Sequence, residues 1–404
     1  MLWYPKFNFY FRSILSIESG TYLWSKLSQY ANMARLLVIL ALLPLVVIGI
    51  FHLLHVLYFA GTYCSSRAML TGKTVIVTGA NTGIGRTTAL DMAARGARVI
   101  LACRSEARTK PALEEIRQKT KNDQVLFMPL DLASTKSIRN FVSLFLEQEE
   151  RLDILINNAG LISSDEPKYN DDGIELTMAV NHLGPFLLTN LLLDLMKRSS
   201  PGARIVNVSS GLYNFANPLA FQDDFEALKT DGTAGYFESL NLDHLENSHL
   251  YKLLYYVPNS IKQRIVRSVM TPKRIRYNNS KLANVLFTVE LARRLAGTGI
   301  NAYSLHPGVI KTEIGLERDP ISQKSLGIEG GFLKDFRPLH IIRKTLEGGA
   351  QTTICCAVDE KLANESGRYY SDCAAVEVRR PEFYDADLNV RFWEWSAKLT
   401  GLEN

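Results

Sequence analysis

Tyr277 and Lys281 stand four residues apart in the stretch YNNSK, a spacing that places two side chains on one face of a helix. A free phenol has a pKa of about 10, and a nearby ammonium group favours the phenolate and lowers that pKa. Such a phenol could exchange a proton with a substrate oxygen. The spacing alone is a weak signal, because Tyr22 and Lys26 share it where nothing else indicates chemistry. Whether Tyr277 and Lys281 form a catalytic pair must therefore be judged from the elements that surround them.

A glycine-rich turn lies between a predicted strand and a predicted helix. TVIVTG is a short β-branched run typical of a buried strand, ALDMAARG has helical spacing, and ARVILACR is a second apolar strand. Gly79, Gly83 and Gly85 omit Cβ atoms where the backbone must bend or approach a ligand closely. The following helix offers unpaired N–H groups to a pyrophosphate. This βαβ unit predicts a dinucleotide-binding domain.

The end of the second strand bears on the choice between NAD and NADP. An acid at this place would hold the ribose 2′-hydroxyl of NAD. The sequence instead has Cys103 and Arg104, and a guanidinium pairs with a 2′-phosphate. We therefore expect NADP(H), the alternative being that Arg104 is an ordinary surface charge.

Residues 36–60 carry no formal charge and are long enough to cross a bilayer, which takes about 20 residues. We expect a transmembrane anchor at 36–60, an N-terminal segment at 1–35 and a catalytic domain at 70–404. A buried core helix and a cleaved signal peptide, the latter if Met33 is the true start, are the alternatives.

Charge and cysteine content limit the remaining classes. The net charge is +5 with scattered basic residues, so nucleic acid is not expected as a partner. The five cysteines form no C-x-x-C pair, so we expect reduced thiols on the cytosolic side and neither a disulfide framework nor a metal site. Two glycosylation sequons, at 207–209 and 278–280, fall inside the predicted core and also favour the cytosolic face.

Several further motifs occur in a fixed order and resemble those of the short-chain dehydrogenase/reductase family. They are TGANTGIG, DLAS at 131–134, NNAG at 157–160, RIVNVSSG at 204–211, YNNSK and HPGVIKT at 306–312. The stretches NHLGPFLLTNLLLDLM and YNNSKLANVLFTVELARRL are closest in wording to the retinol dehydrogenase branch. Members of that branch are membrane-anchored, NADP-preferring enzymes that act on retinoids and other lipophilic aldehydes or alcohols.

The resemblance implies an α/β fold: a doubly wound, mostly parallel Rossmann sheet with helices on both faces. It implies that Tyr277 protonates the carbonyl oxygen as hydride arrives from the nicotinamide, while Lys281 holds the ribose hydroxyls. Ser210 would bind the substrate oxygen, with Ser209 as its neighbouring rival, and Asn181 would hold a water in the proton relay. The cofactor contacts implied are Gly79, Asn81, Thr82, Gly83, Ile84, Gly85, Arg104, Asp131, Asn158, Tyr277, Lys281, Pro307, Gly308 and Thr312.

The segment between Ser210 and Tyr277 is longer than the family pattern, which indicates an insertion at about 212–275. It is basic and amphipathic, so a membrane-surface segment, a substrate lid and an ordinary surface insertion all stay open.

The expected function is hydride transfer between NADP(H) and a lipophilic aldehyde, ketone or alcohol, with retinal and retinol first. A steroid or fatty-aldehyde substrate is the alternative within the class, and a catalytically silent NADPH-binding membrane scaffold is the alternative outside it. We expect a single-pass protein of the endoplasmic reticulum membrane facing the cytosol, and leave open whether it forms a homodimer.

Overall fold

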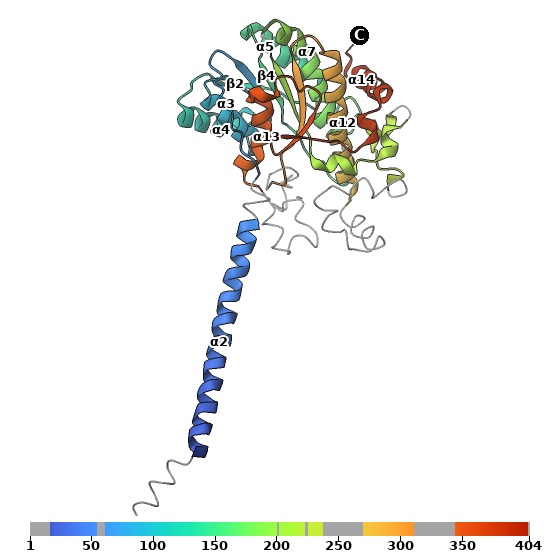
Figure 1. Cartoon of the computed structure of the whole chain (residues 1–404). Coiled ribbons are helices and arrows are strands. Elements are labelled where there is room, and N and C mark those ends of the chain that lie inside the picture. The colour runs from blue at the N-terminus through green and yellow to red at the C-terminus, as the bar shows by residue number, and fades with distance from the viewer. Residues whose placement is uncertain are drawn as a thin grey trace, which may run out of the picture. The chain divides into compact units, whose positions relative to one another are not determined.

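The computed structural model divides the chain into two units, Met1–Phe59 and Ala60–Asn404, which are described separately (Figure 1). The residues that it describes are 17–54, 61–199, 202–222, 225–236, 270–310 and 344–402.

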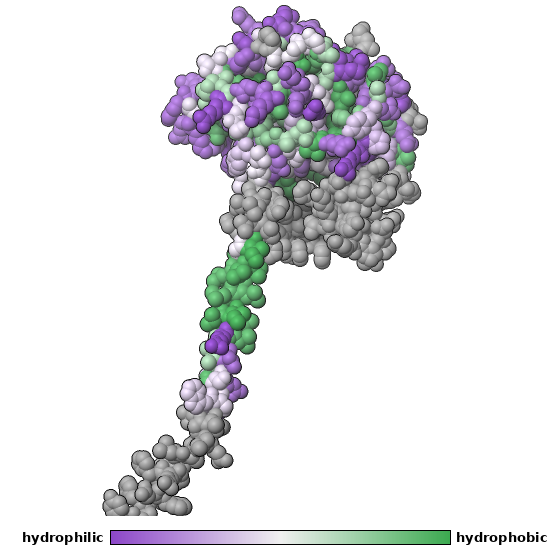
Figure 2. Space-filling model, in the orientation of Figure 1, coloured by the Kyte–Doolittle hydropathy of each residue, from purple (hydrophilic) through white to green (hydrophobic). Residues whose placement is uncertain are grey.

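The first unit contains one long helix, α2 (Ile17–Leu54). The most apolar 18-residue window of its stretch Trp24–Ile50 has a mean hydropathy of 2.7 and no buried residue, which makes the stretch a candidate membrane span. Figure 2 shows apolar side chains along the C-terminal part of this helix. The helix begins well before the predicted run, and residues 55–60 of that run lie outside the described residues. Leu176–Ser199 is also long and apolar enough to span, but 72% of its most apolar window is buried, as in a core helix.

The second unit is built around an eight-stranded sheet, counted over the described residues, with the order β3-β2-β1-β4-β5-β6-β7-β8. All neighbouring strands pair in parallel except β7 and β8. The central strands are apolar on both faces because helices cover both. The predicted doubly wound, mostly parallel fold is therefore confirmed. The strands are β1 (Thr74–Thr78), β2 (Arg98–Cys103), β3 (Val125–Pro129), β4 (Ile154–Asn157), β5 (Arg204–Val208), β6 (Asn301–His306), β7 (Tyr369–Ser371) and β8 (Ala374–Val376).

Two hydrophobic cores lie on opposite faces of this sheet. Strand β1 contributes to both cores, because the side chains of Val75 and Val77 pack in one core while that of Ile76 packs in the other. The first core receives α3, α4 and α13, and the second receives α5, α7, α12 and α14 (Figure 1). These helices are α3 (Gly83–Ala94), α4 (Glu106–Thr120), α5 (Thr135–Gln148), α7 (Gly184–Ser199), α12 (Pro272–Arg294), α13 (Leu346–Val358) and α14 (Ala386–Thr400). The shorter helical turns are α6 (Leu176–Met178), η2 (Ala179–Leu183), η7 (Glu360–Leu362) and η8 (Pro381–Phe383).

The described part of the predicted insertion packs onto the domain through aromatic residues. It contains η3 (Gly211–Phe215), η4 (Pro218–Phe221) and α8 (Glu226–Thr230). The rings of Phe221 and Phe225 contact Phe392 of α14 at centroid distances of 5.8 and 5.3 Å.

The structure tests the predicted basic character of the insertion only at the C-terminal end of the insertion. Residues 237–269, which hold much of the predicted basic stretch, lie outside the described residues. Arg276, a basic residue directly after the predicted insertion, is buried in α12 and cannot face a membrane surface.

The expectation that all cysteines are free thiols is wrong for two of them. Cys355 and Cys373 form a disulfide. Their separation of 18 residues belongs to no recognisable motif, and they meet only because the β7–β8 turn returns beside α13. Cys64, Cys103 and Cys356 are free thiols.

Candidate active site

The candidate residues gather at the carboxyl edge of the sheet. Gly79 follows β1, Asn158 follows β4, Ser210 lies just beyond β5 and Pro307 follows β6. These four strands are consecutive neighbours in the sheet. Because parallel strands end at a common edge, residues distant in sequence are brought together where ligands bind in such folds.

Helix α12 brings the tyrosine and the lysine to this edge. The helix starts at Pro272, whose missing N–H is tolerated in a first turn. Tyr277 is 8% exposed, and Lys281 is buried one turn later. The Lys281 ammonium donates to the Val208 carbonyl at 2.9 Å and lies 5.4 Å from the centre of the Tyr277 ring. The phenol of Tyr277 and the ammonium of Lys281 therefore lie in one buried region beside the carboxyl end of β5.

The two serines after β5 have different partners. The Ser209 hydroxyl donates to the Lys281 carbonyl at 2.7 Å, so it fastens α12 to the sheet. The Ser210 hydroxyl accepts from the Leu212 N–H at 3.2 Å and is hydrogen-bonded with the Tyr277 phenol. Of the two serines, Ser210 is therefore the one that interacts with the phenol of Tyr277.

The pKa of Tyr277 shifts opposite to the expectation. Burial raises it to about 12, and the hydrogen bond with Ser210 offsets only part of that rise. Burial also lowers the pKa of Lys281 to about 8. The expected lowering of the Tyr277 pKa by the ammonium was wrong because both groups are enclosed, and burial disfavours the charged form of each.

Asn181 lies in η2, a short π-helical turn, a distortion that often occurs at functional sites. Its side chain accepts from the Leu161 N–H at 2.8 Å and donates to the Leu161 carbonyl at 2.9 Å and the Ser280 hydroxyl at 3.0 Å. A Cβ built on Gly160 would lie 3.4 Å from both Asn181 Oδ1 and Lys281 Nζ. The amide and the ammonium therefore border the same point.

The glycine turn fits the pyrophosphate of a nicotinamide dinucleotide. Gly79 and Gly83 have φ values of +66° and +58°, and a Cβ on Gly83 would project into open space. A Cβ on Gly85 would lie 2.4 Å from Asn158 Nδ2 and from the Gly79 carbonyl, so only glycine fits there. Thr82 makes no side-chain cap at the start of α3, which leaves the first N–H groups of this helix available to an anion.

The other expected cofactor contacts differ in exposure. Arg104 is exposed immediately after β2, and Asp131 is half-buried after β3, where its carboxylate accepts from the Ala133 N–H at 3.0 Å. The Ile84 side chain is in the core, which leaves only its backbone amide for a ligand. Asn81 is half-buried in the glycine turn, Pro307 is buried, Gly308 has a φ of +93°, and Thr312 lies outside the described residues.

Sequence reasoning missed two residues that support the site. The Ser280 hydroxyl accepts from Asn181 and donates to the Tyr277 carbonyl at 2.7 Å, so it connects the π-turn to α12. Arg276 is buried beside Tyr277, pairs with Glu175 and Asp231, and donates to the carbonyls of residues 164 and 165. Ser280 lies inside YNNSK and Arg276 directly before it, and this position was the sign in the sequence that could have indicated their role. A buried guanidinium needs partners, and Arg276 finds them on several elements.

Known proteins are similar to this chain in both sequence and fold. A short chain dehydrogenase family model matches residues 73–222. Retinol dehydrogenase 13 of Homo sapiens is 40% identical over 351 residues, covering 86% of this chain and 90% of that protein. Retinol dehydrogenase 12 of Homo sapiens is 40% identical over 85% of this chain and 92% of its own length. The crystal structure of an uncharacterised protein from Mycobacterium Paratuberculosis aligns with a TM-score of 0.54 at 26% identity, covering 85% of this chain and 98% of that one.

Proposed function

The chain belongs to the short-chain dehydrogenase/reductase family, in its retinol dehydrogenase-like branch, and from this premise we propose that it is a membrane-anchored, NADP(H)-dependent oxidoreductase of lipophilic carbonyl compounds and alcohols. Retinal and retinol are the first candidate substrates because relatives at 40% identity are named for retinol. Steroids and fatty aldehydes are the alternatives.

The observation that carries this proposal is the buried Ser210–Tyr277–Lys281 cluster. A phenol with a pKa of about 12 keeps its proton at neutral pH and can donate it from Oη to a carbonyl oxygen. Ser210, already hydrogen-bonded with that phenol, would hold the same oxygen in place. NADPH, when bound, supplies the hydride.

Lys281 and Asn181 manage charge and protons around the phenol. The Lys281 ammonium is held by the Val208 carbonyl close to the Tyr277 ring, where positive charge favours proton release from the phenol. Asn181 borders the ammonium across Gly160 and would extend the path by which Tyr277 regains its proton.

The preference for NADP(H) rests on Arg104. It is exposed at the carboxyl end of β2, where a ribose 2′-phosphate would need a cation and a 2′-hydroxyl would need an acid. Ser105 next to it caps α4 by accepting from the Arg108 N–H, so the chain direction at Arg104 is fixed.

The membrane and its sidedness are part of the same proposal. Helix α2 would supply the anchor. The sequon residues Asn207 and Asn278 are buried and hydrogen-bonded inside the domain, so no glycan could be attached to the folded protein there. This supports a catalytic domain on the cytosolic face, and the endoplasmic reticulum is the membrane that we propose.

The test is Tyr277→Phe in the full-length chain, assayed in detergent micelles with NADPH and a panel of retinoid, steroid and fatty aldehydes. We expect turnover to fall by about 100-fold or more, the contribution typical of a positioned acid, while NADPH binding is kept. Tyr303→Phe is the matched control, because Tyr303 lies in β6 and its hydroxyl donates to the Leu362 carbonyl of η7 at 2.6 Å.

Two outcomes would contradict the proposal. Equal turnover by the parent and Tyr277→Phe would remove the phenol from the chemistry. No turnover of any carbonyl by a parent protein that binds NADPH would favour the silent scaffold instead.

A further inference from the structure

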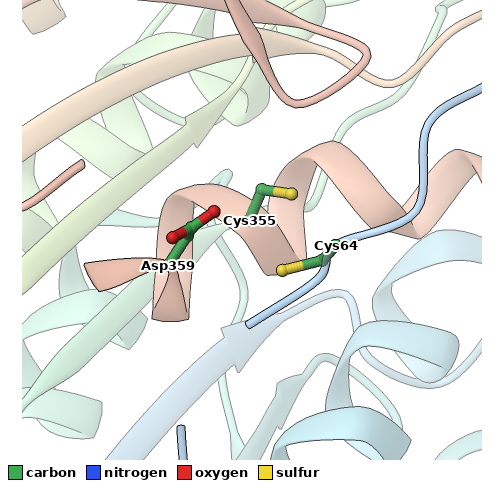
Figure 3. A group of neighbouring side chains, drawn as sticks. All are labelled: Cys64, Cys355 and Asp359. Carbon is green, nitrogen blue, oxygen red and sulfur yellow. The ribbon is translucent and has the colours of Figure 1, made fainter. Parts of the chain in front are cut away.

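Outside the candidate active site, two sulfur atoms and a carboxylate converge beside the C-terminal end of α13. One ligand atom each from Cys64, Cys355 and Asp359 lies within 4.8 Å of the others. Figure 3 shows that Cys355 and Asp359 come from the end of α13, one turn apart, while Cys64 comes from the segment that precedes β1. Three side chains with affinity for metal ions thus meet from two remote parts of the chain.

A third sulfur, that of Cys373, lies beside this group of three ligand atoms but outside the 4.8 Å set. Cys373 is bonded to Cys355, and its Sγ lies 3.4 Å from the carbonyl oxygen of Gln351 in α13. Asp372 and Cys373 form the turn between β7 and β8 with φ values of +52° and +60°. Such values are unfavourable for residues other than glycine, asparagine and aspartate, so a cysteine held there indicates a requirement for its side chain.

The approach of Cys64 to α13 is fixed by contacts on both sides of it. The Cys64 N–H donates to Gln351 Oε1 at 3.0 Å. Two residues later, the Ser66 hydroxyl donates to Glu360 Oε2 at 2.9 Å, and Arg95 donates to the Ser66 carbonyl at 3.1 Å. The sulfur of Cys64 is therefore positioned by the fold.

We propose that Cys64, Cys355, Cys373 and Asp359 bind one Zn²⁺ when the Cys355–Cys373 pair is reduced. A dithiol reductant supplies two electrons and two protons, breaks the S–S bond and leaves two thiols, and is itself converted to a disulfide. Zn²⁺ then displaces the protons of three thiols to solvent as it forms three Zn–S bonds and one Zn–O bond. The set is closed and four-coordinate, as in structural zinc sites.

The ligand types select the metal. Three thiolates and one carboxylate suit zinc, whereas Mg²⁺ and Ca²⁺ require more oxygen ligands. Zn–S bonds of about 2.3 Å in a tetrahedron place the sulfur atoms about 3.8 Å apart. The present separations, up to 4.8 Å between Cys64, Cys355 and Asp359, need to contract by about 1 Å, and reduction frees the Cys373 sulfur to move from its bonded position onto the ion.

The orientation of the Asp359 carboxylate also suits a metal ligand. Asp359 Oδ1 accepts from the Lys361 N–H at 3.0 Å, which orients the carboxylate and leaves its second oxygen for the metal. The bound ion would tie the segment around Cys64 to α13, a structural role separate from the proposed chemistry at Tyr277.

The test uses the full-length chain in detergent, reduced with a dithiol that is then removed under anaerobic conditions. Titration with Zn²⁺ against a chromophoric chelator should give one ion per chain with a Kd below about 0.1 µM. Co²⁺ in place of Zn²⁺ should give thiolate-to-cobalt charge-transfer absorption. Cys64→Ser and Asp359→Asn should each weaken Zn²⁺ binding, the former by at least about 100-fold, while Cys103→Ala, a buried thiol in β2, should not.

The proposal fails if the reduced chain takes up no Zn²⁺, or if Cys64→Ser and Cys373→Ser hold the ion as tightly as the parent. It also fails if the Cys355–Cys373 bond re-forms in air at the same rate with and without Zn²⁺, as judged by mass spectrometry after alkylation. Circular dichroism of each variant confirms that a loss of binding is not a loss of fold. Because the readouts are metal content and absorption spectra, they stand apart from the test of Tyr277.

Discussion

Ser209 and Ser210 are adjacent in sequence but should respond very differently to substitution by alanine. Ser210→Ala removes the hydrogen bond with the buried Tyr277 phenol, and the Leu212 N–H that it also serves belongs to a partly exposed residue. A hydrogen bond to a group that changes charge is worth about 1.5–3 kcal/mol, which corresponds to about 10- to 100-fold in kcat/KM. Stability should change little, because water can replace the bond at Leu212.

Ser209→Ala should show the reverse pattern. It loses only the 2.7 Å bond to the Lys281 carbonyl, which still accepts a bond within α12. A loss of about 0.5–1.5 kcal/mol in the free energy of unfolding is expected, with a fall in Tm of a few degrees and kcat/KM within about threefold of the parent.

Both variants are assayed by cofactor absorbance with retinal and NADPH, with thermal unfolding measured on the same preparations. The reasoning is refuted if Ser209→Ala slows turnover as much as Ser210→Ala while its Tm stays at the parent value. It is also refuted if Ser210→Ala retains the parent rate, since the phenol would then need no partner at that position.

Three further predictions use separate measurements. The pKa of Lys281 is lowered to about 8, so kcat/KM for carbonyl reduction should be level below that pH and decline above it as the ammonium loses its proton; Lys281→Arg, whose guanidinium stays protonated, should lack this decline in a pH profile. Arg104→Ser should raise KM for NADPH by about tenfold or more and leave KM for NADH nearly unchanged, and equal effects on both cofactors would remove the 2′-phosphate role. Replacing Leu40 and Leu43 with Lys should cost about 2.5–3.5 kcal/mol of insertion free energy each and reduce the carbonate-resistant membrane fraction, whereas an unchanged fraction would argue against α2 as the span.

Much of the fold could be predicted because its determinants are local. The apolar strands, the helix spacing and the glycines of the first turn each constrain a few neighbouring residues, and the order of the elements then limits the topology. Gly79 and Gly83 have the positive φ values that a tight turn before a helix requires. The convergence of Ser210 and Tyr277 likewise follows from parallel strands that end at one edge.

What the sequence did not reveal depends on burial and on remote contacts. The spacing of Tyr277 and Lys281 predicts that they are neighbours but not that both are enclosed, and enclosure decides the direction of the pKa shift. The choice between Ser209 and Ser210 depends on which hydroxyl faces α12. The cysteine cluster unites Cys64 with residues about 300 positions later, so no local spacing could indicate it.

The two shifted pKa values in the active site also bear on the direction of the reaction. Forming the phenolate of Tyr277 at pH 7 requires about 4 kcal/mol for an ordinary tyrosine, and a pKa of about 12 adds about 3 kcal/mol to that cost. Alcohol oxidation needs the phenolate before it can accept a proton, whereas carbonyl reduction starts from the protonated phenol. Above its pKa of about 8, Lys281 is neutral before Tyr277 ionises, so the ammonium cannot ease proton loss where alkaline pH would otherwise favour it. Burial therefore keeps the phenol in the protonated form that carbonyl reduction uses, and for this reason we expect kcat for reduction to exceed kcat for oxidation at neutral pH.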